Sequence, residues 1–239
     1  GVDVYRVGVV PTPAVAYLVA STGADLGVMI SASHNPMPDN GIKLFQRGGE
    51  KLADDVEALV EARIGEPWQR PTGAAVGRVI NDDQLVNKYI EHLLSTIDVS
   101  LSGLKVVVDC ANGASSFTAP VALSRAGAEV IAIANSPDGW NINDGVGSTH
   151  LDYLRNAVLK NGADVGIAHD GDADRCLAID AAGNEIDGDV IMAILAKGFK
   201  AQGKLKTNTI VGTVMSNLGF MHAMAESGIE VVTTAVGDR

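Results

Sequence analysis

Three carboxylates alternate with small residues in the segment Asp170–Arg175, which has the sequence DGDADR. The small residues between the acids allow the backbone to coil closely around one centre. Carboxylate oxygens are the ligands that hard cations such as Mg²⁺ and Ca²⁺ prefer. Three neighbouring anions repel one another unless a cation or an arginine neutralises them. The segment therefore predicts a divalent-cation site formed by Asp170, Asp172 and Asp174.

An EF-hand loop also begins with acidic residues at its first, third and fifth positions. Such a loop needs Gly at position 6 and Glu at position 12, where this chain has Arg175 and Ala181, so the EF-hand is excluded. The alternative that stays open is a solvated acidic turn. The strand-like run that leads into the segment, and the arginine that ends it, favour the cation site.

A second polar segment, Ser31–Pro36 with the sequence SASHNP, contains a serine that could act as a nucleophile or carry a phosphate. Ser33 is not the nucleophile of a hydrolase elbow, because GxSxG is absent. Spacing assigns no Ser-His-Asp triad, since His34 is merely adjacent in sequence. Lys43 follows within one short loop. Taken alone, the segment is more typical of a capped turn, and a lone lysine of a solvated surface charge.

The elements that must position these segments alternate between strand and helix. Apolar, β-branched runs predict strands at 4–10, 26–31, 104–109, 129–134, 164–168, 176–180, 185–186, 209–215 and 230–236. Periodic runs between them predict helices at 12–21, 53–64, 81–96, 113–126, 149–160, 190–200 and 217–226. Helix starts are expected at Thr12, at Asn81 and at a Thr149–Asp152 capping box. This alternation predicts an α/β fold with mainly parallel, mixed sheets covered by helices.

One internal repeat points to tandem, similar α/β domains. The sequence GADLGV at Gly23–Val28 recurs as GADVGI at Gly162–Ile167, and the same offset places Ser33 opposite Asp172. Both polar segments then leave the C-terminal ends of corresponding strands, where open α/β sheets bind ligands. The alternative is a chance similarity between two helix ends that are each followed by a strand.

Length and composition limit the class of protein. A chain of 239 residues suggests one or two domains, with three smaller units still open. A hydrophobic fraction of 46% and a charged fraction of 20% exclude a disordered chain, a collagen-like chain and a coiled coil. Only 4% of the residues are aromatic, which predicts an aliphatic core. The net charge of −11 argues against nucleic acid or an anionic membrane as the main partner, but it allows a small phosphorylated ligand.

The chain contains no apolar run long enough for a transmembrane helix and no signal peptide. Its two cysteines, Cys110 and Cys176, form no CxxC motif, which favours a reducing cytosol. Both are expected to be small core residues. The sequence opens in a strand without Met and stops at Gly237-Asp238-Arg239, so we expect a fragment of a longer protein.

The combination of SASHNP, NGIK at Asn40–Lys43 and DGDADR resembles the motif series of the α-D-phosphohexomutases. Further segments resemble the phosphoglucosamine mutase branch of that superfamily, namely Val108–Ala114, Asn141–Asn143, Gly147–Thr149, Asp187–Asp189, Met215–Asn217 and Val236–Arg239. The resemblance covers essentially the whole chain. One departure is Ala173, where the family more often has Gly. The extra methyl group should be tolerated if φ is not positive at that position.

The resemblance implies a four-domain enzyme whose first three domains are similar α/β units. This chain would hold most of domain one over 1–98, domain two over 99–204 and the start of domain three over 205–239. It would lack the family's N-terminal arginine-bearing loop, its sugar-recognition loop and its C-terminal phosphate-binding domain.

The reaction that the resemblance implies is the interconversion of glucosamine 6-phosphate and glucosamine 1-phosphate through a bisphosphorylated sugar. Ser33 would carry the phosphoryl group in transit. One Mg²⁺ would be held by Ser33, Asp170, Asp172 and Asp174, because a phosphoserine adds a charge of about −1.5 to −2 beside three carboxylates.

The resemblance also implies roles for three neighbouring side chains. Arg175 would make a bidentate phosphate contact. Lys43 would neutralise developing charge or shuttle the hydroxyl proton, and His34 would orient the phosphoserine or the proton path. The implied partner is a phosphorylated hexosamine in the cytoplasm, with neither nucleic acid nor membrane, and a homodimer is left open.

Three other interpretations stay open. The chain could belong to another branch of the superfamily that acts on glucose or mannose phosphates. It could be a phosphatase of the haloacid dehalogenase type, in which Asp170 rather than Ser33 would carry the phosphate. It could also be a folded, non-catalytic fragment that binds a metal or a partner.

Overall fold

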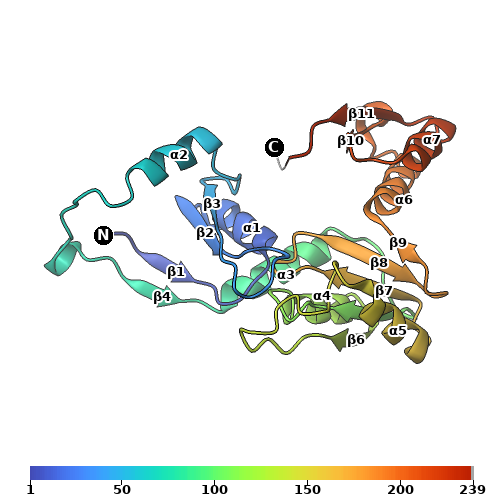
Figure 1. The fold of residues 1–239 in the computed structure, drawn as a ribbon, viewed down its shortest axis with the longest axis horizontal. Helices are drawn as coiled ribbons and strands as arrows, with labels where there is room; N and C mark the ends of the chain where they lie inside the picture. Colours follow the sequence, from blue (N-terminus) through green and yellow to red (C-terminus); the bar gives the residue numbers. More distant parts are fainter. Residues whose placement is uncertain (238–239) are drawn as a thin grey trace. The chain divides into compact units, whose positions relative to one another are not determined.

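A computed structural model describes residues 1–237, so Asp238 and Arg239 of the Val236–Arg239 segment lie outside the described residues. The chain divides into two compact units, Gly1–Gly183 and Asn184–Arg239, which are described separately below (Figure 1). The α/β fold class is confirmed. The main sheet of the first unit mixes parallel and antiparallel pairs, and the two paired strands of the second unit are parallel.

The first half of the first unit contains two small sheets and three helices. Its elements are β1 (Val4–Arg6), α1 (Thr12–Thr22), β2 (Leu26–Ile30), β3 (Ile42–Gln46), α2 (Asp54–Ala62), β4 (Val79–Asn81) and α3 (Gln84–Ser95). Strand β1 pairs in parallel with β4, and β2 pairs antiparallel with β3. Small and aliphatic residues of α1, among them Ala14 and Val15, pack against Phe45 of β3 and Tyr89 of α3 to form one core.

The second half of the first unit is a sheet with strand order β6-β5-β7-β8. Its elements are β5 (Lys105–Asp109), α4 (Thr118–Arg125), β6 (Glu129–Ile133), α5 (Leu151–Asn161), β7 (Val165–His169) and β8 (Cys176–Asp180). Strand β5 runs parallel to β6 and β7, and β8 is antiparallel to β7. Val107 packs with α5 and Val108 packs with α4. Because successive strand residues point to opposite faces, the two helices cover opposite faces of this sheet.

The internal repeat occupies equivalent places in both halves. Helix α1 ends at Gly23 and helix α5 ends at Gly162, and both glycines adopt the left-handed conformation that closes a helix. Each glycine is followed by a strand, a polar loop and an antiparallel strand, namely β2 and β3 in the first half and β7 and β8 in the second. The two polar loops are therefore equivalent in topology, as the repeat predicts.

The second unit contains β9 (Glu185–Ile186), α6 (Gly188–Ala201), β10 (Thr209–Thr213), α7 (Leu218–Glu226) and β11 (Glu230–Thr234). Strands β10 and β11 are parallel, and the core combines Ala196, Phe220, Met224 and Ile229. The Asp187 side chain caps α6 by accepting a hydrogen bond from the backbone N–H of Val190. Among the described residues, no helix has both the length and the apolar character needed to cross a bilayer.

Three predicted helix caps are wrong. Helix α1 begins at Thr12, as predicted, but the cap position is Pro11, and the Thr12 hydroxyl bonds to Asp172 and caps no helix. Asn81 ends β4, and α3 begins after Asp83. Helix α5 follows His150 without a side-chain cap. The Thr149 hydroxyl lies 3.1 Å from Nδ1 of His150 instead. The carboxylate of Asp152 pairs with Arg155.

Two strands and one cysteine also differ from expectation. The sequence does not predict β3 and β4. Strand β4 is only three residues long, and β3 follows turn-forming residues and pairs with β2 across the serine loop. Both cysteines are free, and Cys110 is buried as predicted. Cys176 is exposed, because the side chain at the first position of β8 faces outward from the sheet, so its prediction as a core residue is wrong.

Candidate active site

The acidic loop, Asp170–Arg175, leaves the C-terminal end of β7 and brings three carboxylates together. One oxygen from each of Asp170, Asp172 and Asp174 lies within 4.8 Å of the others. Asp170 and Asp172 are almost fully buried, whereas the side chain of Asp174 is 34% exposed. The loop thus forms a half-open cluster of oxygens, with two acids in its floor and one at its rim.

The backbone of the acidic loop is fixed by hydrogen bonds from both halves of the first unit. The carbonyl of Gly171 accepts from the N–H of Ala114 at 2.7 Å, and the carbonyl of Asp172 accepts from the N–H of Thr12 at 2.8 Å. Ala173 adopts φ of +57°. Its backbone is therefore in the left-handed region, where a methyl side chain is strained and glycine is not. A non-glycine residue in this region costs about 1–2 kcal/mol.

The serine loop, Ser31–Gly41, leaves the end of β2 and presents Ser33 to the acidic loop. The Ser33 hydroxyl donates to Oδ2 of Asp170 at 2.9 Å, and Ser33 itself has φ of +57°. Asn143 ties the loop down, because its Nδ2 donates to the carbonyls of Ser33 and Asn35 at 2.9 and 3.0 Å. The structure therefore brings together the two segments that the sequence singles out.

Lys43 and Thr12 complete the contacts with the carboxylates. Nζ of Lys43, on β3, lies 2.6 Å from Oδ2 of Asp172 and 2.8 Å from Oδ2 of Asp174. The Thr12 hydroxyl donates to the same Asp172 oxygen at 2.6 Å. One buried carboxylate thus accepts two short hydrogen bonds, both from the first half of the unit.

These contacts move the pKa values of neighbouring acids in opposite directions. Burial raises the pKa of Asp170, and together with the charges of Asp172 and Asp174 it outweighs the hydrogen bonds from Ser33 and from the N–H of Arg175, which lower that pKa. Burial acts in the same sense on Asp172, but the hydrogen bonds from Lys43 and Thr12 outweigh it and lower its pKa. Burial alone would lower the pKa of Lys43, and its two carboxylate partners raise it above the usual range, so this amine keeps its proton.

The donor set fits a divalent cation. Asp172 Oδ1 is buried and accepts no hydrogen bond within the described part of the chain. Three carboxylates and the Ser33 hydroxyl offer only oxygen atoms, which suits a hard ion such as Mg²⁺. The ammonium of Lys43 already balances part of the negative charge.

The two other predicted site residues differ in how closely they are held. Nε of Arg175 lies 3.8 Å from Asp170 and 3.9 Å from Asp174, and its side chain is half exposed. His34 is exposed, and no hydrogen bond or ion pair with another described residue holds its side chain. Arg175 therefore lies near two carboxylates of its own loop, whereas His34 is exposed to solvent.

Sequence reasoning missed two residues of this site and gave a third only a general role. Thr12 was assigned to a helix cap, and Asp109 was read only as the end of a strand. Asp109 is fully buried and accepts hydrogen bonds from the N–H groups of Ala111 and Gly147. The sequence predicts only a loop-shaping role for Asn143. In the structure, its side chain fixes the serine loop through two hydrogen bonds to backbone carbonyls. The available signal is that Asp109 ends a predicted strand and that Thr12 and Asn143 lie in segments that follow predicted strands, at the edge where loops converge.

Three family models match this chain in succession. They describe the α/β/α domains I, II and III of the phosphoglucomutase/phosphomannomutase family, and they match residues 1–70, 87–183 and 187–239.

Two curated relatives show which proteins this chain resembles in sequence. Phosphoglucosamine mutase from Streptomyces griseus is 61% identical over 100% of this chain and 54% of its own length. Phosphoglucosamine mutase from Acidothermus cellulolyticus is also 61% identical, over 100% of this chain and 52% of its own length. The chain thus spans about half the length of the curated relatives it matches.

Solved structures share the fold. A phosphoglucomutase/phosphomannomutase family protein from Burkholderia thailandensis matches with a TM-score of 0.81 and 25% identity, over 99% of this chain and 52% of that chain. N-acetylphosphoglucosamine mutase from Aspergillus fumigatus, solved in complex with GlcNAc-6P and magnesium, matches with a TM-score of 0.67 and 18% identity, over 98% of this chain and 63% of that chain.

Proposed function

The chain belongs to the phosphoglucomutase/phosphomannomutase family, and we propose that it is the part of a phosphoglucosamine mutase that carries the phosphoserine and the metal ligands. The reaction is the interconversion of glucosamine 6-phosphate and glucosamine 1-phosphate. The observation that carries the proposal is the 2.9 Å hydrogen bond from the Ser33 hydroxyl to Asp170, inside a cluster of three carboxylates. A serine so placed can carry a phosphoryl group at the point where a cation can stabilise it.

In the proposed reaction, Ser33 carries the phosphoryl group between two positions of the sugar. The bond from phosphorus to Ser33 Oγ breaks as the bond from phosphorus to a sugar hydroxyl forms, which gives the bisphosphorylated sugar. The other phosphate, which the substrate carried at the start, is then transferred to Ser33 Oγ as its bond to the sugar oxygen breaks. The hydrogen bonds of Asn143 to the serine loop hold the nucleophile in place, and such positioning supplies much of the catalysis in phosphoryl transfer.

Asp170, Asp172, Asp174 and the oxygen on Ser33 are the proposed ligands of one Mg²⁺. When bound, the ion supplies positive charge beside the phosphoryl group and polarises it. The buried, unpartnered Oδ1 of Asp172 supports this assignment, because such an oxygen is costly unless something binds it.

Lys43 is the proposed charge-neutralising residue. Its two carboxylate contacts raise its pKa, which favours a permanent ammonium over a proton shuttle. Arg175 is half exposed beside the acidic loop, so its guanidinium can reach a phosphate of the sugar. We assign His34 to the proton path, because its exposed ring is free to turn toward Ser33.

The whole protein's context is part of the proposal. A phosphorylated hexosamine is the partner, the location is the cytoplasm, and neither nucleic acid nor a membrane is involved; a homodimer stays open. We propose three family domains, with the first boundary near residue 98. The second boundary, expected near 204 from the sequence, lies earlier in this proposal, because the third family model begins at residue 187 and the second compact unit begins at Asn184.

Two alternatives have specific signatures. A mutase acting on glucose or mannose phosphates would use the same loops, but the names of the 61%-identical relatives favour the glucosamine branch. A phosphatase of the haloacid dehalogenase type would carry phosphate on Asp170, which here is fully buried beneath the Ser33 hydroxyl. A folded, non-catalytic fragment would take no phosphate on either residue.

The test is phosphosite mapping after incubation of the chain with glucosamine 1,6-bisphosphate and Mg²⁺. We expect one phosphoryl group on Ser33, lost in Ser33→Ala and retained in the matched control Ser116→Ala, whose hydroxyl bonds only to the backbone of Gly113. A phosphoryl group on Asp170 would contradict the serine mechanism. An unmodified wild-type chain under conditions that retain Mg²⁺ binding would favour the non-catalytic fragment.

A further inference from the structure

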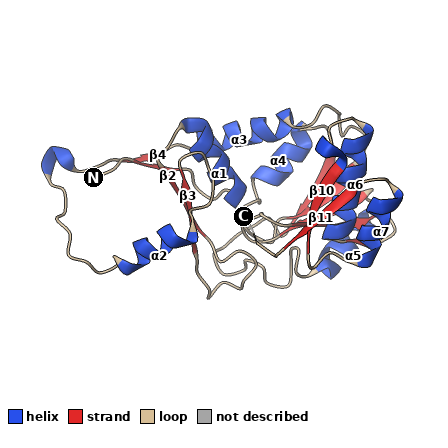
Figure 2. Cartoon of the chain, turned by 90° about the horizontal axis from the view of Figure 1, so that it is seen from above, coloured by secondary structure: helices blue, strands red, loops and turns tan. Residues whose placement is uncertain are grey.

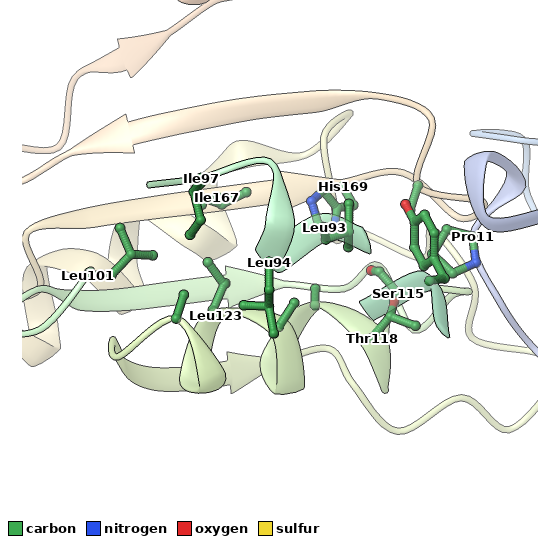
Figure 3. A pocket seen from close by; sticks show the side chains of 15 residues that line it. Pro11, Leu93, Leu94, Ile97, Leu101, Ser115, Thr118, Leu123, Ile167 and His169 are labelled. Carbon is green, nitrogen blue, oxygen red and sulfur yellow. The ribbon is translucent and has the colours of Figure 1, made fainter. Parts of the chain in front are cut away.

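A cavity lies beside the active site and plays no part in the proposed reaction. It has a volume of about 330 Å³ and lies between helices α3 and α4, which pack side by side in the first unit (Figures 2 and 3). Leu93 of α3 and Ile97, which follows the C-terminal end of that helix, line one wall, and Ala119 and Leu123 of α4 line the other. The volume is several times the roughly 30 Å³ that one water molecule takes up, and it exceeds an engineered apolar cavity of about 150 Å³ that binds benzene.

The two ends of the cavity differ in polarity. Figure 3 shows Ile97 and Leu101 at one end and Ser115 and His169 at the other, near Pro11. None of the residues that line the cavity carries a carboxylate, an ammonium or a guanidinium group. The cavity is therefore unsuited to a sugar phosphate, and it suits a molecule with an apolar body and one neutral polar group.

The polar end contains two buried atoms that lack a hydrogen-bond partner among the described residues, Ser115 Oγ and His169 Nδ1. Ser115 is 1% exposed, and only the thiol of Cys110, a weak hydrogen-bonding group, lies beside its oxygen. A buried polar atom without a partner is costly, and a ligand that supplies the missing bonds recovers that cost.

We propose that this cavity binds a small neutral molecule that has one hydroxyl group on an aromatic or alicyclic body. A hydroxyl suits the polar end, because it can donate one hydrogen bond and accept another, as pairing with both Ser115 Oγ and His169 Nδ1 requires. The body fills the space lined by Leu93, Ile97 and Leu123.

The site adjoins the acidic loop without sharing its ligands. Ala173 of that loop lines the cavity, as does Pro11, the residue before Thr12. An occupant therefore contacts the acidic loop at Ala173. This inference stands apart from the proposed function, because it needs neither phosphate nor metal.

The test uses phenol and toluene as probes, because they have the same size and differ in the hydroxyl group. Isothermal titration and NMR line broadening of the probe are measured on the 239-residue chain and on Ser115→Ala. We expect saturable binding of both probes to the natural sequence, with phenol at least fivefold tighter. Ser115→Ala should remove most of that preference and leave the affinity for toluene within about twofold.

A blocking variant locates the binding. Ala122→Phe places a ring into the cavity from α4 and should abolish binding of both probes. If this variant does not fold, transferred nuclear Overhauser effects from phenol protons to the methyl groups of Leu93 and Leu123 serve in its place. Equal affinity for phenol and toluene, absence of saturable binding, or binding retained in the folded Ala122→Phe variant would overturn the proposal.

Discussion

The serine loop and the acidic loop leave equivalent strands, yet the two strands are held differently. Strand β7 lies between β5 and β8, whereas β2 pairs only with β3 among the described strands. Asp170 and Asp172 are buried at the end of β7, but Ile30 and Ile42, which flank the serine loop, are 73% and 70% exposed. The acidic loop is thus supported by its own sheet, and the serine loop depends on contacts with its neighbour.

The difference assigns a task to each loop. Metal ligands must be held in fixed geometry before the ion arrives, which a buried loop on a sheet achieves. A phosphoryl carrier must meet two positions of a sugar, and it is accordingly attached through a few specific bonds. The bonds from Asn143 to the backbone of the serine loop can hold it in both states, whereas the bond from the Ser33 hydroxyl to Asp170 exists only in the unphosphorylated chain.

Asp170→Asn should have the largest effect, because it removes a charged ligand that is buried and close to Ser33. We expect affinity for Mn²⁺, a spectroscopic substitute for Mg²⁺, to fall at least about 100-fold, or roughly 2.7 kcal/mol. Asp174→Asn changes the exposed member of the cluster and should cost about tenfold. Electron paramagnetic resonance of free Mn²⁺ measures both. Equal losses of Mn²⁺ affinity in the two variants would contradict the difference between the buried Asp170 and the partly exposed Asp174.

Gly171→Ala should break the contact between the loops. An added Cβ would lie 2.6 Å from the carbonyl oxygen of Ser33 and 2.7 Å from Nδ2 of Asn143. We expect the free energy of unfolding of the first unit to fall by about 2–3 kcal/mol, measured in urea. Gly188→Ala is the matched control, because its Cβ meets no atom within 4 Å, and it should change stability by less than about 0.5 kcal/mol. A neutral Gly171→Ala would show that the loops do not need this close approach.

Thr12→Val should weaken the anchor between the two halves of the first unit. The substitution removes a 2.6 Å hydrogen bond to a buried carboxylate, with an expected loss of about 2 kcal/mol near pH 7. The bond helps to hold the pKa of Asp172 below its usual value, so its stabilisation is present above about pH 4. It is lost as pH falls through the lowered pKa.

The pH dependence distinguishes this account from a packing defect. The stability difference between the natural sequence and Thr12→Val should shrink as Asp172 is protonated at acid pH. Thr22→Val, which removes a hydroxyl bonded to a helix carbonyl, should give a small difference that does not vary with pH. A constant difference for Thr12→Val would mean that the charge of Asp172 is not involved.

The smallest expected effect is on stability, when glycine replaces the one strained residue in each loop. Ala173 and Ser33 both have φ of +57°, which glycine adopts without strain. Ala173→Gly should stabilise the chain by about 0.5–1 kcal/mol, after allowance for the greater freedom of glycine in the unfolded state. Ser33→Gly should gain less, because it also loses the bond to Asp170. Thermal unfolding measures both, and a destabilising Ala173→Gly would contradict the strain.

The sequence predicts the loops better than the contacts between them. The internal repeat and the alternation of apolar runs are local patterns, and they place β7, β8 and the acidic loop correctly. Strand β3 escapes prediction because its residues pair with β2 only after the long serine loop has folded back. Thr12 is assigned to a cap because its real partner, Asp172, is far along the chain. The three acids can be identified from one short segment of the sequence. Their partners, Thr12, Ser33 and Lys43, are known only once the tertiary fold brings distant segments together.

The most direct test of the shared site is ³¹P NMR of the Ser33-phosphorylated chain during titration with substoichiometric Mn²⁺. Paramagnetic broadening requires the metal and the phosphorus to be close together. The account predicts that the phosphoserine resonance broadens in the natural sequence and stays sharp in Asp170→Asn at the same Mn²⁺ concentration. A resonance that stays sharp in the natural sequence, while Mn²⁺ is bound, would show that the serine and acidic loops do not form one site.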